Sequence, residues 1–140
     1  MITTVTDRTV LLDTSAAIAL SNPQDKFHKS AINYYQNTKV IWIVLNVTTH
    51  ETFTRQRYKR NLKQALKSYD YLRGTNFNLI NFESSDESEA RRILEKYNDQ
   101  NFSFYDALCA AVMLRIGMYR VFAFDIHFWI LGFQVEPGII

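Results

Sequence analysis

Apolar residues along the chain form short runs that alternate with longer segments of helical character. The short runs are rich in β-branched and aromatic residues or alternate apolar with polar positions, as is typical of strands. They cover residues 9–12, 39–47, 77–82, 120–124 and 134–135. The longer segments carry apolar residues three or four positions apart, or are almost wholly apolar, and this predicts helices. The expected helices cover residues 15–21, 24–37, 61–73, 84–97 and 104–116, with another starting near residue 49.

Strands separated by helices predict parallel pairing, with the helices packed on both faces of the sheet. The segment 104–116 is nearly all apolar, so we expect it to be a central buried helix that ends at Gly117. A length of 140 residues suits one domain. The fold class is therefore α/β, a single domain over residues 1–140 with a mainly parallel central sheet. Residues 1–7 form an N-terminal extension ahead of the first strand.

The composition is that of a globular protein, with 47% hydrophobic and 21% charged residues. Cys109 is the only cysteine, which excludes an internal disulfide and a cysteine-based zinc site. The expected location is therefore the reducing cytoplasm. The first residues lack the basic start and apolar core of a signal peptide. No segment approaches the roughly 20 apolar residues that a membrane-spanning helix needs, so no membrane partner is expected.

The formal net charge of +2 conceals two segments of opposite sign. Residues 51–73 hold seven cations and two anions, whereas residues 83–99 hold six anions and three cations. A basic segment can attract a phosphate backbone through counterion release. A solvated helix face explains the same charges without any ligand.

Four carboxylates occupy positions at or near the ends of predicted strands. Asp13 and Asp125 each directly follow a predicted strand, so parallel pairing places them at the same edge of the sheet. Glu51 and Asp106 lie in the first turns of predicted helices, and Asp106 joins the group only if its helix begins at that edge. Converging carboxylates repel one another unless a cation lies between them, and Mg²⁺ or Mn²⁺ prefers oxygen ligands.

Each of these acids also has a purely structural interpretation. Asp13 fits an N-cap of the helix that follows it, and Asp125 fits a cap of the segment after it. Thr48 and Glu51 fit a capping box, as do Ser103 and Asp106. Capping does not explain why acids recur at one edge of the sheet.

The acids lie in segments that resemble the four acidic motifs of PIN-domain nucleases. These segments are Leu11-Leu12-Asp13-Thr14-Ser15, Thr48-x-x-Glu51, Ser103-Phe104-Tyr105-Asp106-Ala107-Leu108 and Phe124-Asp125-x-x-Phe128. They occur in the family's order and with similar spacing, and the resemblance extends from about residue 8 to residue 135. The third motif is the most specific, because its acid opens an alanine-rich apolar helix. Ala123 departs from the Thr or Ser that family members often carry two residues before the fourth acid.

The resemblance implies a Mg²⁺- or Mn²⁺-dependent ribonuclease, often the VapC-type toxin of a toxin–antitoxin pair. The metal ligands and catalytic residues would be Asp13, Glu51, Asp106 and Asp125. Ser15 would support the first acid. A surface that guides RNA would comprise Arg55, Arg57, Lys59, Arg60 and Lys63. The resemblance further implies an antitoxin partner and a homodimer, with RNA cut to leave 5′-phosphate and 3′-hydroxyl ends.

Other functions remain to be weighed against the nuclease. A non-catalytic PIN-like module would bind RNA or protein and keep the acids as helix caps. A phosphatase of the haloacid-dehalogenase type would need Asp-x-Asp after the first strand, where this chain has Ser15. His127 is expected to be a surface imidazole. The aromatic residues near Trp129 are expected to lie mostly in the core, with a dimer face or antitoxin groove as the alternative.

Overall fold

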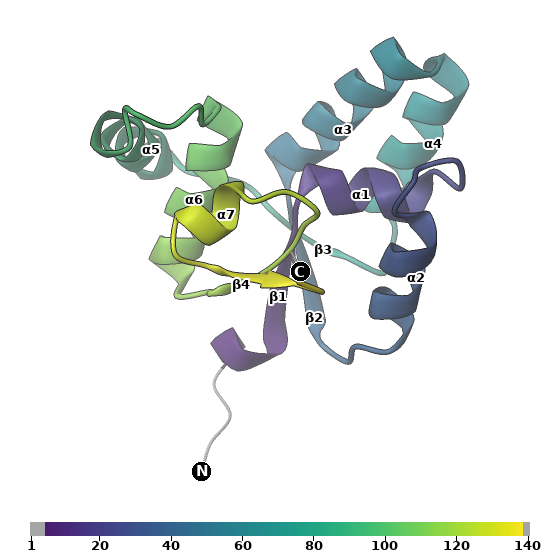
Figure 1. The fold of residues 1–140 in the computed structure, drawn as a ribbon, viewed down its shortest axis with the longest axis horizontal. Helices are drawn as coiled ribbons and strands as arrows, with labels where there is room; N and C mark the ends of the chain where they lie inside the picture. Colours follow the sequence, from purple (N-terminus) through teal and green to yellow (C-terminus); the bar gives the residue numbers. More distant parts are fainter. Residues whose placement is uncertain (1–4, 139–140) are drawn as a thin grey trace.

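A five-stranded parallel sheet forms the centre of the molecule (Figure 1). The computed structural model describes residues 5–138, with side chains from residue 7 onward. The strands are β1 (Thr9–Leu12), β2 (Ile41–Leu45), β3 (Asn78–Ile80), β4 (Arg120–Phe122) and β5 (Gln134–Glu136). They are arranged in the order β3-β2-β1-β4-β5, and every neighbouring pair is parallel. The predicted α/β class with a parallel sheet is confirmed.

Seven α-helices and one short 3₁₀ helix are found within the described residues. They are η1 (Val5–Arg8), α1 (Thr14–Ser21), α2 (His28–Gln36), α3 (Asn46–Lys59), α4 (Leu62–Leu72), α5 (Ser84–Lys96), α6 (Phe104–Ile116) and α7 (His127–Ile130). Helices α1 to α4 lie on one side of the molecule and α5 to α7 on the other (Figure 1). Part of the proposed N-terminal extension, residues 1–4, lies outside the described residues. No helix in residues 5–138 is both long and apolar enough to cross a bilayer.

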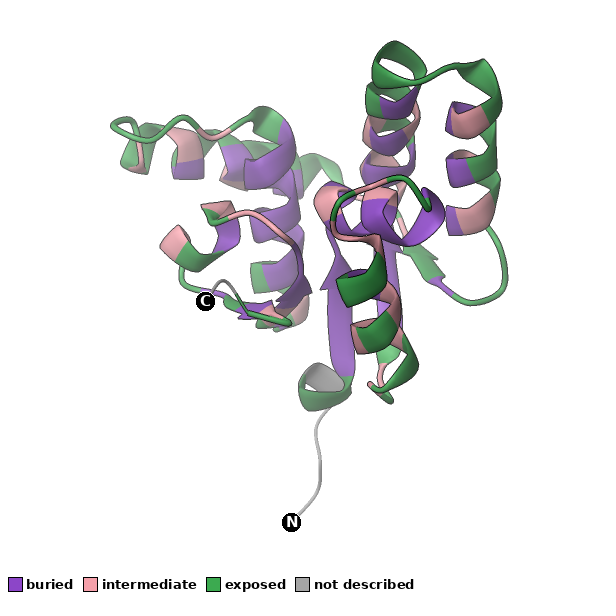
Figure 2. Ribbon diagram, turned by 45° about the vertical axis from the view of Figure 1, so that its right-hand side comes forward, coloured by how far each residue is buried: buried purple, intermediate pink, exposed green. Residues whose placement is uncertain are grey.

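The sheet separates two hydrophobic cores, because successive side chains of a strand point to opposite faces. On β1, Leu11 packs in the core that contains α6, whereas Val10 and Leu12 pack in the core that contains α1. The central strands are buried on both faces (Figure 2). The nearly all-apolar α6 matches its predicted bounds and ends at Gly117, whose φ of 86° is left-handed.

Several boundaries differ from those predicted, and local hydrogen bonds explain them. Residues 24–27 form turns instead of the start of a helix, and the Asp25 carboxylate accepts a hydrogen bond from the Phe27 backbone amide. Helix α3 begins at Asn46, where a strand was expected, and the Thr49 hydroxyl donates to the Asn46 carbonyl inside its first turn. The cap of α5 is Glu83 instead of a serine, because Glu83 and Asp86 form a reciprocal capping box.

Candidate active site at the carboxyl edge of the sheet

Asp13 lies in the turn between β1 and α1, at the carboxyl end of the central strand. Its side chain is the N-cap of α1 and accepts a hydrogen bond from the Ser15 backbone amide at 3.1 Å. The Ser15 hydroxyl donates to the same oxygen, Oδ2, at 2.6 Å. The other oxygen, Oδ1, accepts from the Tyr105 hydroxyl at 3.0 Å. The carboxylate is therefore held in one orientation by α1 and α6 together, and Asp13 is only 2% exposed.

Tyr105 connects three elements at this site, and the sequence motifs did not single it out. Its hydroxyl oxygen accepts a hydrogen bond from the Thr14 backbone amide at 3.1 Å and lies 3.0 Å from the Thr48 hydroxyl oxygen. Because the one phenolic proton is donated to Asp13, the Thr48 hydroxyl is the donor to Tyr105. A tyrosine in an otherwise apolar buried helix, next to Asp106, is the signal that would have identified it.

A Tyr105→Phe variant is expected to be less stable by about 1–3 kcal/mol, because the buried Thr14 amide loses its acceptor and Asp13 loses a donor. Urea unfolding at neutral pH measures the difference. Tyr58→Phe is the matched control, since that side chain is exposed on α3. Equal losses for the two variants would show that the Tyr105 network contributes nothing to stability.

Electrostatics make the ionised form of Asp13 costly in the metal-free protein. Burial of the carboxylate, together with the negative charge of Asp125, raises the pKa of Asp13 to about 6 from an ordinary value of 3.8. Hydrogen bonds from Ser15 and Tyr105 oppose the shift without cancelling it. A cation bound at this carboxylate would oppose the shift, because its positive charge favours the ionised form.

Asp106 is the N3 residue of α6 and forms the predicted capping box with Ser103. Its Oδ2 accepts from the Ser103 backbone amide at 3.0 Å and lies 3.0 Å from Nδ1 of His127. His127 is 40% exposed, as expected for a surface imidazole, and it contacts this acid from the first turn of α7. Oδ1 of Asp106 makes no hydrogen bond within the part of the chain that the structure describes, so it remains available to a ligand.

The other two acids are held by local partners. Strand β4 ends at Phe122, so Asp125 lies three residues beyond it instead of directly after it, and its carboxylate accepts from the His127 backbone amide. Glu51 lies in the second turn of α3 because that helix starts at Asn46, and it pairs with Arg55 at 3.1 Å. The predicted capping box of Thr48 and Glu51 is therefore wrong, since Leu45 is the N-cap.

The structure brings part of the predicted acidic group together. Asp125 acts electrostatically on Asp13, and Asp106 and Asp13 both act on the buried Cys109. Among the described side chains, no three acidic, histidine or cysteine groups lie close enough to hold a metal ion. The donor chemistry nevertheless fits a hard divalent cation, because Asp13 and Asp106 offer carboxylate oxygens and no described side chain supplies a cationic partner for Asp13.

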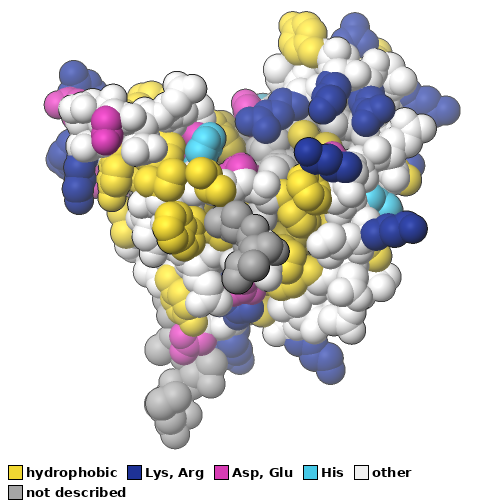
Figure 3. All heavy atoms as spheres, in the orientation of Figure 1, with side chains coloured by type: hydrophobic (Ala, Val, Ile, Leu, Met, Phe, Trp, Pro, Cys, Tyr) yellow, Lys and Arg dark blue, Asp and Glu magenta, His cyan; other side chains and the backbone are white. Residues whose placement is uncertain are grey.

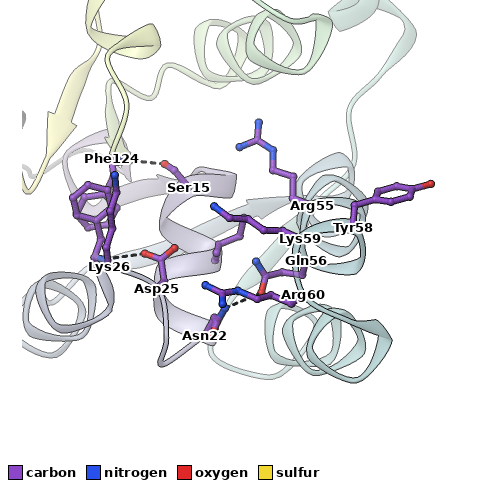
Figure 4. A pocket seen from close by; sticks show the side chains of 12 residues that line it. Ser15, Asn22, Asp25, Lys26, Arg55, Gln56, Tyr58, Lys59, Arg60 and Phe124 are labelled. Atoms are coloured by element: carbon purple, nitrogen blue, oxygen red, sulfur yellow. Dashed lines mark hydrogen bonds between the residues drawn. The ribbon is translucent and has the colours of Figure 1, made fainter.

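A basic cavity of about 490 Å³ extends to Ser15 (Figure 4), the residue whose hydroxyl donates to Asp13. Ser15 lines it, and the Ser15 hydroxyl accepts a hydrogen bond from the Phe124 backbone amide, which ties the loop after β4 to the site. Of the predicted RNA-guiding residues, the ones that line this cavity are Arg55, Lys59 and Arg60. Lys63 lines a smaller adjoining cavity with Arg60. Arg57 lines neither, since two positions along a helix lead to a different face.

Lys and Arg side chains gather over α3 and α4 on the surface of the molecule (Figure 3). The predicted basic block is thus an exposed surface, and the cavity that part of it lines also includes Ser15, which bonds to the buried Asp13.

The PIN domain family model matches residues 10–132. The chain is 26% identical over 129 residues to the 23S rRNA-specific endonuclease VapC20 of Mycobacterium tuberculosis, with 91% of this chain and 98% of that protein covered. The crystal structure of that VapC20, a sarcin–ricin loop cleaving toxin, has a TM-score of 0.84 at 24% identity and covers 94% of this chain and 98% of its own. A toxin–antitoxin complex from Klebsiella pneumoniae has a TM-score of 0.67 at 15% identity, over 94% of this chain and 99% of its own.

Proposed function

Since the chain belongs to the PIN-domain family, we propose that it is a divalent-metal-dependent endoribonuclease, the toxin of a type II toxin–antitoxin pair. The observation that carries the proposal is the buried Asp13 carboxylate, whose ionisation is disfavoured by burial and by Asp125, and whose hydrogen-bond partner Ser15 lines a basic cavity. Groups with perturbed pKa values cluster at functional sites, and open parallel sheets bind ligands at the carboxyl ends of their strands. Asp13 has both features, which favours a catalytic role.

Asp13 and Asp106 would hold Mg²⁺ or Mn²⁺, with Asp125 and Glu51 joining directly or through water. When bound, the cation would lower the pKa of water and neutralise the charge that develops on a phosphodiester. Ser15 and Tyr105 fix the direction in which the Asp13 oxygens point. Glu51 pairs with Arg55, so its participation requires that side chain to turn away from its present partner.

The basic side chains beside the site would bind the phosphates of RNA. Arg55 and Lys59 are four residues apart on α3 and therefore share one face, which lines the cavity next to Ser15. Phosphates bound along this face would pass Asp13. Hydrolysis of the phosphodiester there would leave 5′-phosphate and 3′-hydroxyl ends.

Purified chain incubated with RNA is expected to cut it in the presence of Mg²⁺ or Mn²⁺ and to stop when a chelator is added. The first substrate to test is 23S rRNA, because the VapC20 relative is named for cutting it. Gel analysis of the fragments and of their end groups measures the reaction. An absence of metal-dependent cleavage across ribosomal, transfer and messenger RNA would contradict the proposal.

A non-catalytic module is the second candidate, because every one of the four acids has a structural partner. Asp13 and Asp106 cap helices, Asp125 binds the His127 amide, and Glu51 pairs with Arg55. The two candidates differ in thermal unfolding with Mn²⁺. Binding of the cation to the folded chain raises the melting temperature. At a free cation concentration of one hundred times the dissociation constant, binding adds about 2.7 kcal/mol to the free energy of unfolding. A module whose acids serve only as caps shows no change.

We further propose that the chain forms a homodimer and binds an antitoxin. Trp129, expected to lie mostly in the core, is 65% exposed, and Ile126 and Tyr119 are exposed beside it. These side chains line a hollow of about 820 Å³, and apolar surface of this kind is typical of protein interfaces.

A Trp129→Asp variant is expected to elute as a monomer where the unaltered chain elutes as a dimer, because burying the new charge in the interface costs free energy. Size-exclusion chromatography with light scattering measures the mass. The control is Leu114→Asp, at an exposed apolar position on α6, and this variant should stay dimeric. A monomeric unaltered chain would contradict the homodimer.

A further inference from the structure

The basic cavity that Ser15 lines has a polar floor that the cleavage chemistry does not use. Asn22, the C-cap of α1, and Gln56 of α3 meet there, and they are only 3% and 1% exposed. The Asn22 side-chain amide nitrogen donates to Oε1 of Gln56 at 3.2 Å. Two buried amide side chains from separate helices thus form the floor of the basic cavity (Figure 4).

The hydrogen-bond network fixes which way the Gln56 amide faces. The Gln24 backbone amide can only donate, and it donates to Asn22 at 3.0 Å, so the acceptor there is Oδ1. The Asn22 amide nitrogen must then face Gln56, which in turn must present its oxygen to Asn22. The Gln56 amide nitrogen, Nε2, is left without a partner within the described residues and is the donor that this side chain offers to the cavity.

The other polar groups around the cavity are also mainly donors. Lys26, Arg55, Lys59 and Arg60 line it, against the single carboxylate of Asp25. That carboxylate already accepts from the Phe27 backbone amide. In Figure 4, Lys59 extends from α3 toward the middle of the cavity, whereas Tyr58 points away from it. A ligand must therefore offer acceptors.

The lining also includes two stacked phenylalanine rings. Phe27 and Phe124 stack with their ring centroids 4.6 Å apart and their planes within 3° of parallel. Phe124 directly precedes Asp125 and binds the Ser15 hydroxyl through its backbone amide. A planar apolar group packed beside this pair would lie next to the proposed catalytic edge. The volume of about 490 Å³ is within the range of small-ligand pockets, roughly 300–1,000 Å³.

We propose that this cavity binds a guanine base of the RNA, next to the phosphodiester that is cut. The inference rests on the proposed ribonuclease function and names a base that its site selects. The Gln56 amide nitrogen and a neighbouring cation donate to the O6 and N7 atoms of guanine, and the Phe27–Phe124 pair packs beside the ring. Guanine presents two adjacent acceptors on this edge, whereas adenine has an amino donor next to N7, and cytosine has an amino donor.

Nucleotide binding to the metal-free full chain tests the assignment without altering the protein. The probes are the 5′-monophosphates of guanosine, inosine, adenosine and 7-deazaguanosine, with inorganic phosphate as the base-free arm, measured by calorimetric titration. Inosine keeps both acceptors, so it is expected to bind like guanosine. Adenosine and 7-deazaguanosine are expected to bind about tenfold more weakly. Equal affinity for all four nucleotides, or for phosphate alone, would overturn the proposal.

A Gln56→Glu variant replaces the amide donor on the cavity floor with a carboxylate acceptor of nearly the same shape. One carboxylate oxygen still accepts from Asn22, and the other replaces the donor with an acceptor. The preference for guanosine over adenosine is expected to disappear. Gln36→Glu, at an exposed position of α2 outside the cavity, adds the same charge and should keep the preference. A Gln56→Glu variant that melts like the unaltered chain and still prefers guanosine would refute the role of Gln56.

These measurements separate the base pocket from the nuclease itself, because binding requires neither metal nor cleavage. A chain that cuts RNA without any guanosine preference would refute the pocket alone. A chain that selects guanosine but never cuts RNA would refute the proposed function and leave a guanine-binding site.

Discussion

An Asp13→Asn variant is expected to cut RNA roughly a thousandfold more slowly than the unaltered chain in Mn²⁺. The amide keeps the shape of the side chain and can still accept from Ser15, so helix α1 retains its cap. It removes the negative charge that would hold the cation. Loss of several kcal/mol of metal-assisted stabilisation corresponds to about three orders of magnitude in rate.

Initial cleavage rates with saturating Mn²⁺ measure this effect, and Asp70→Asn provides the control. Asp70 is an exposed carboxylate on α4 and should be replaceable without loss of rate. Asp106→Asn is expected to behave like Asp13→Asn, since Asp106 is the other proposed ligand. Wild-type rates in both Asp13→Asn and Asp106→Asn would show that cutting takes place elsewhere on the chain.

The positions of Asp13 and Ser15 could be predicted because they follow from local rules. An apolar run ending in Asp-Thr-Ser predicts a strand, a turn and a capped helix, and the structure has β1, Asp13 as the N-cap and α1 in that order. The capping box of Ser103 and Asp106 was likewise readable, because both of its hydrogen bonds join residues three apart. Interactions between residues close in the sequence thus made the strands, the helices and part of the site predictable.

Contacts between distant segments could not be read in the same way. Tyr105 and Asp13 are 92 positions apart, and their hydrogen bond exists only because α6 packs near the end of β1. The pairing of Asn22 with Gln56 depends on how α1 and α3 meet, which no spacing in the sequence specifies. The start of α3 at Asn46 also places Glu51 in the second turn instead of the first, because residues expected to continue the strand belong to the helix.

The metal-free protein is expected to lose stability as the pH rises, and Asp13 is the cause. The folded chain holds a proton on Asp13 up to about pH 6, whereas the unfolded chain releases it near 3.8. Between these values the folded state binds more protons than the unfolded state, so the free energy of unfolding decreases with rising pH. From pH 5 to pH 7.5 this group alone accounts for a decrease of about 1.4 kcal/mol.

Comparison with Asp13→Asn isolates that contribution, since every other titrating group is common to both proteins. Urea unfolding in chelator at pH 5 and pH 7.5 should show the unaltered chain losing about 1.4 kcal/mol more than the variant. Adding Mn²⁺ at pH 7.5 should then stabilise the unaltered chain and leave the variant unchanged, because a bound cation offsets the buried charge of Asp13. Identical pH dependence in the two proteins would mean that the Asp13 carboxylate ionises without cost. A bound cation would then gain no extra affinity from offsetting a costly buried charge at Asp13.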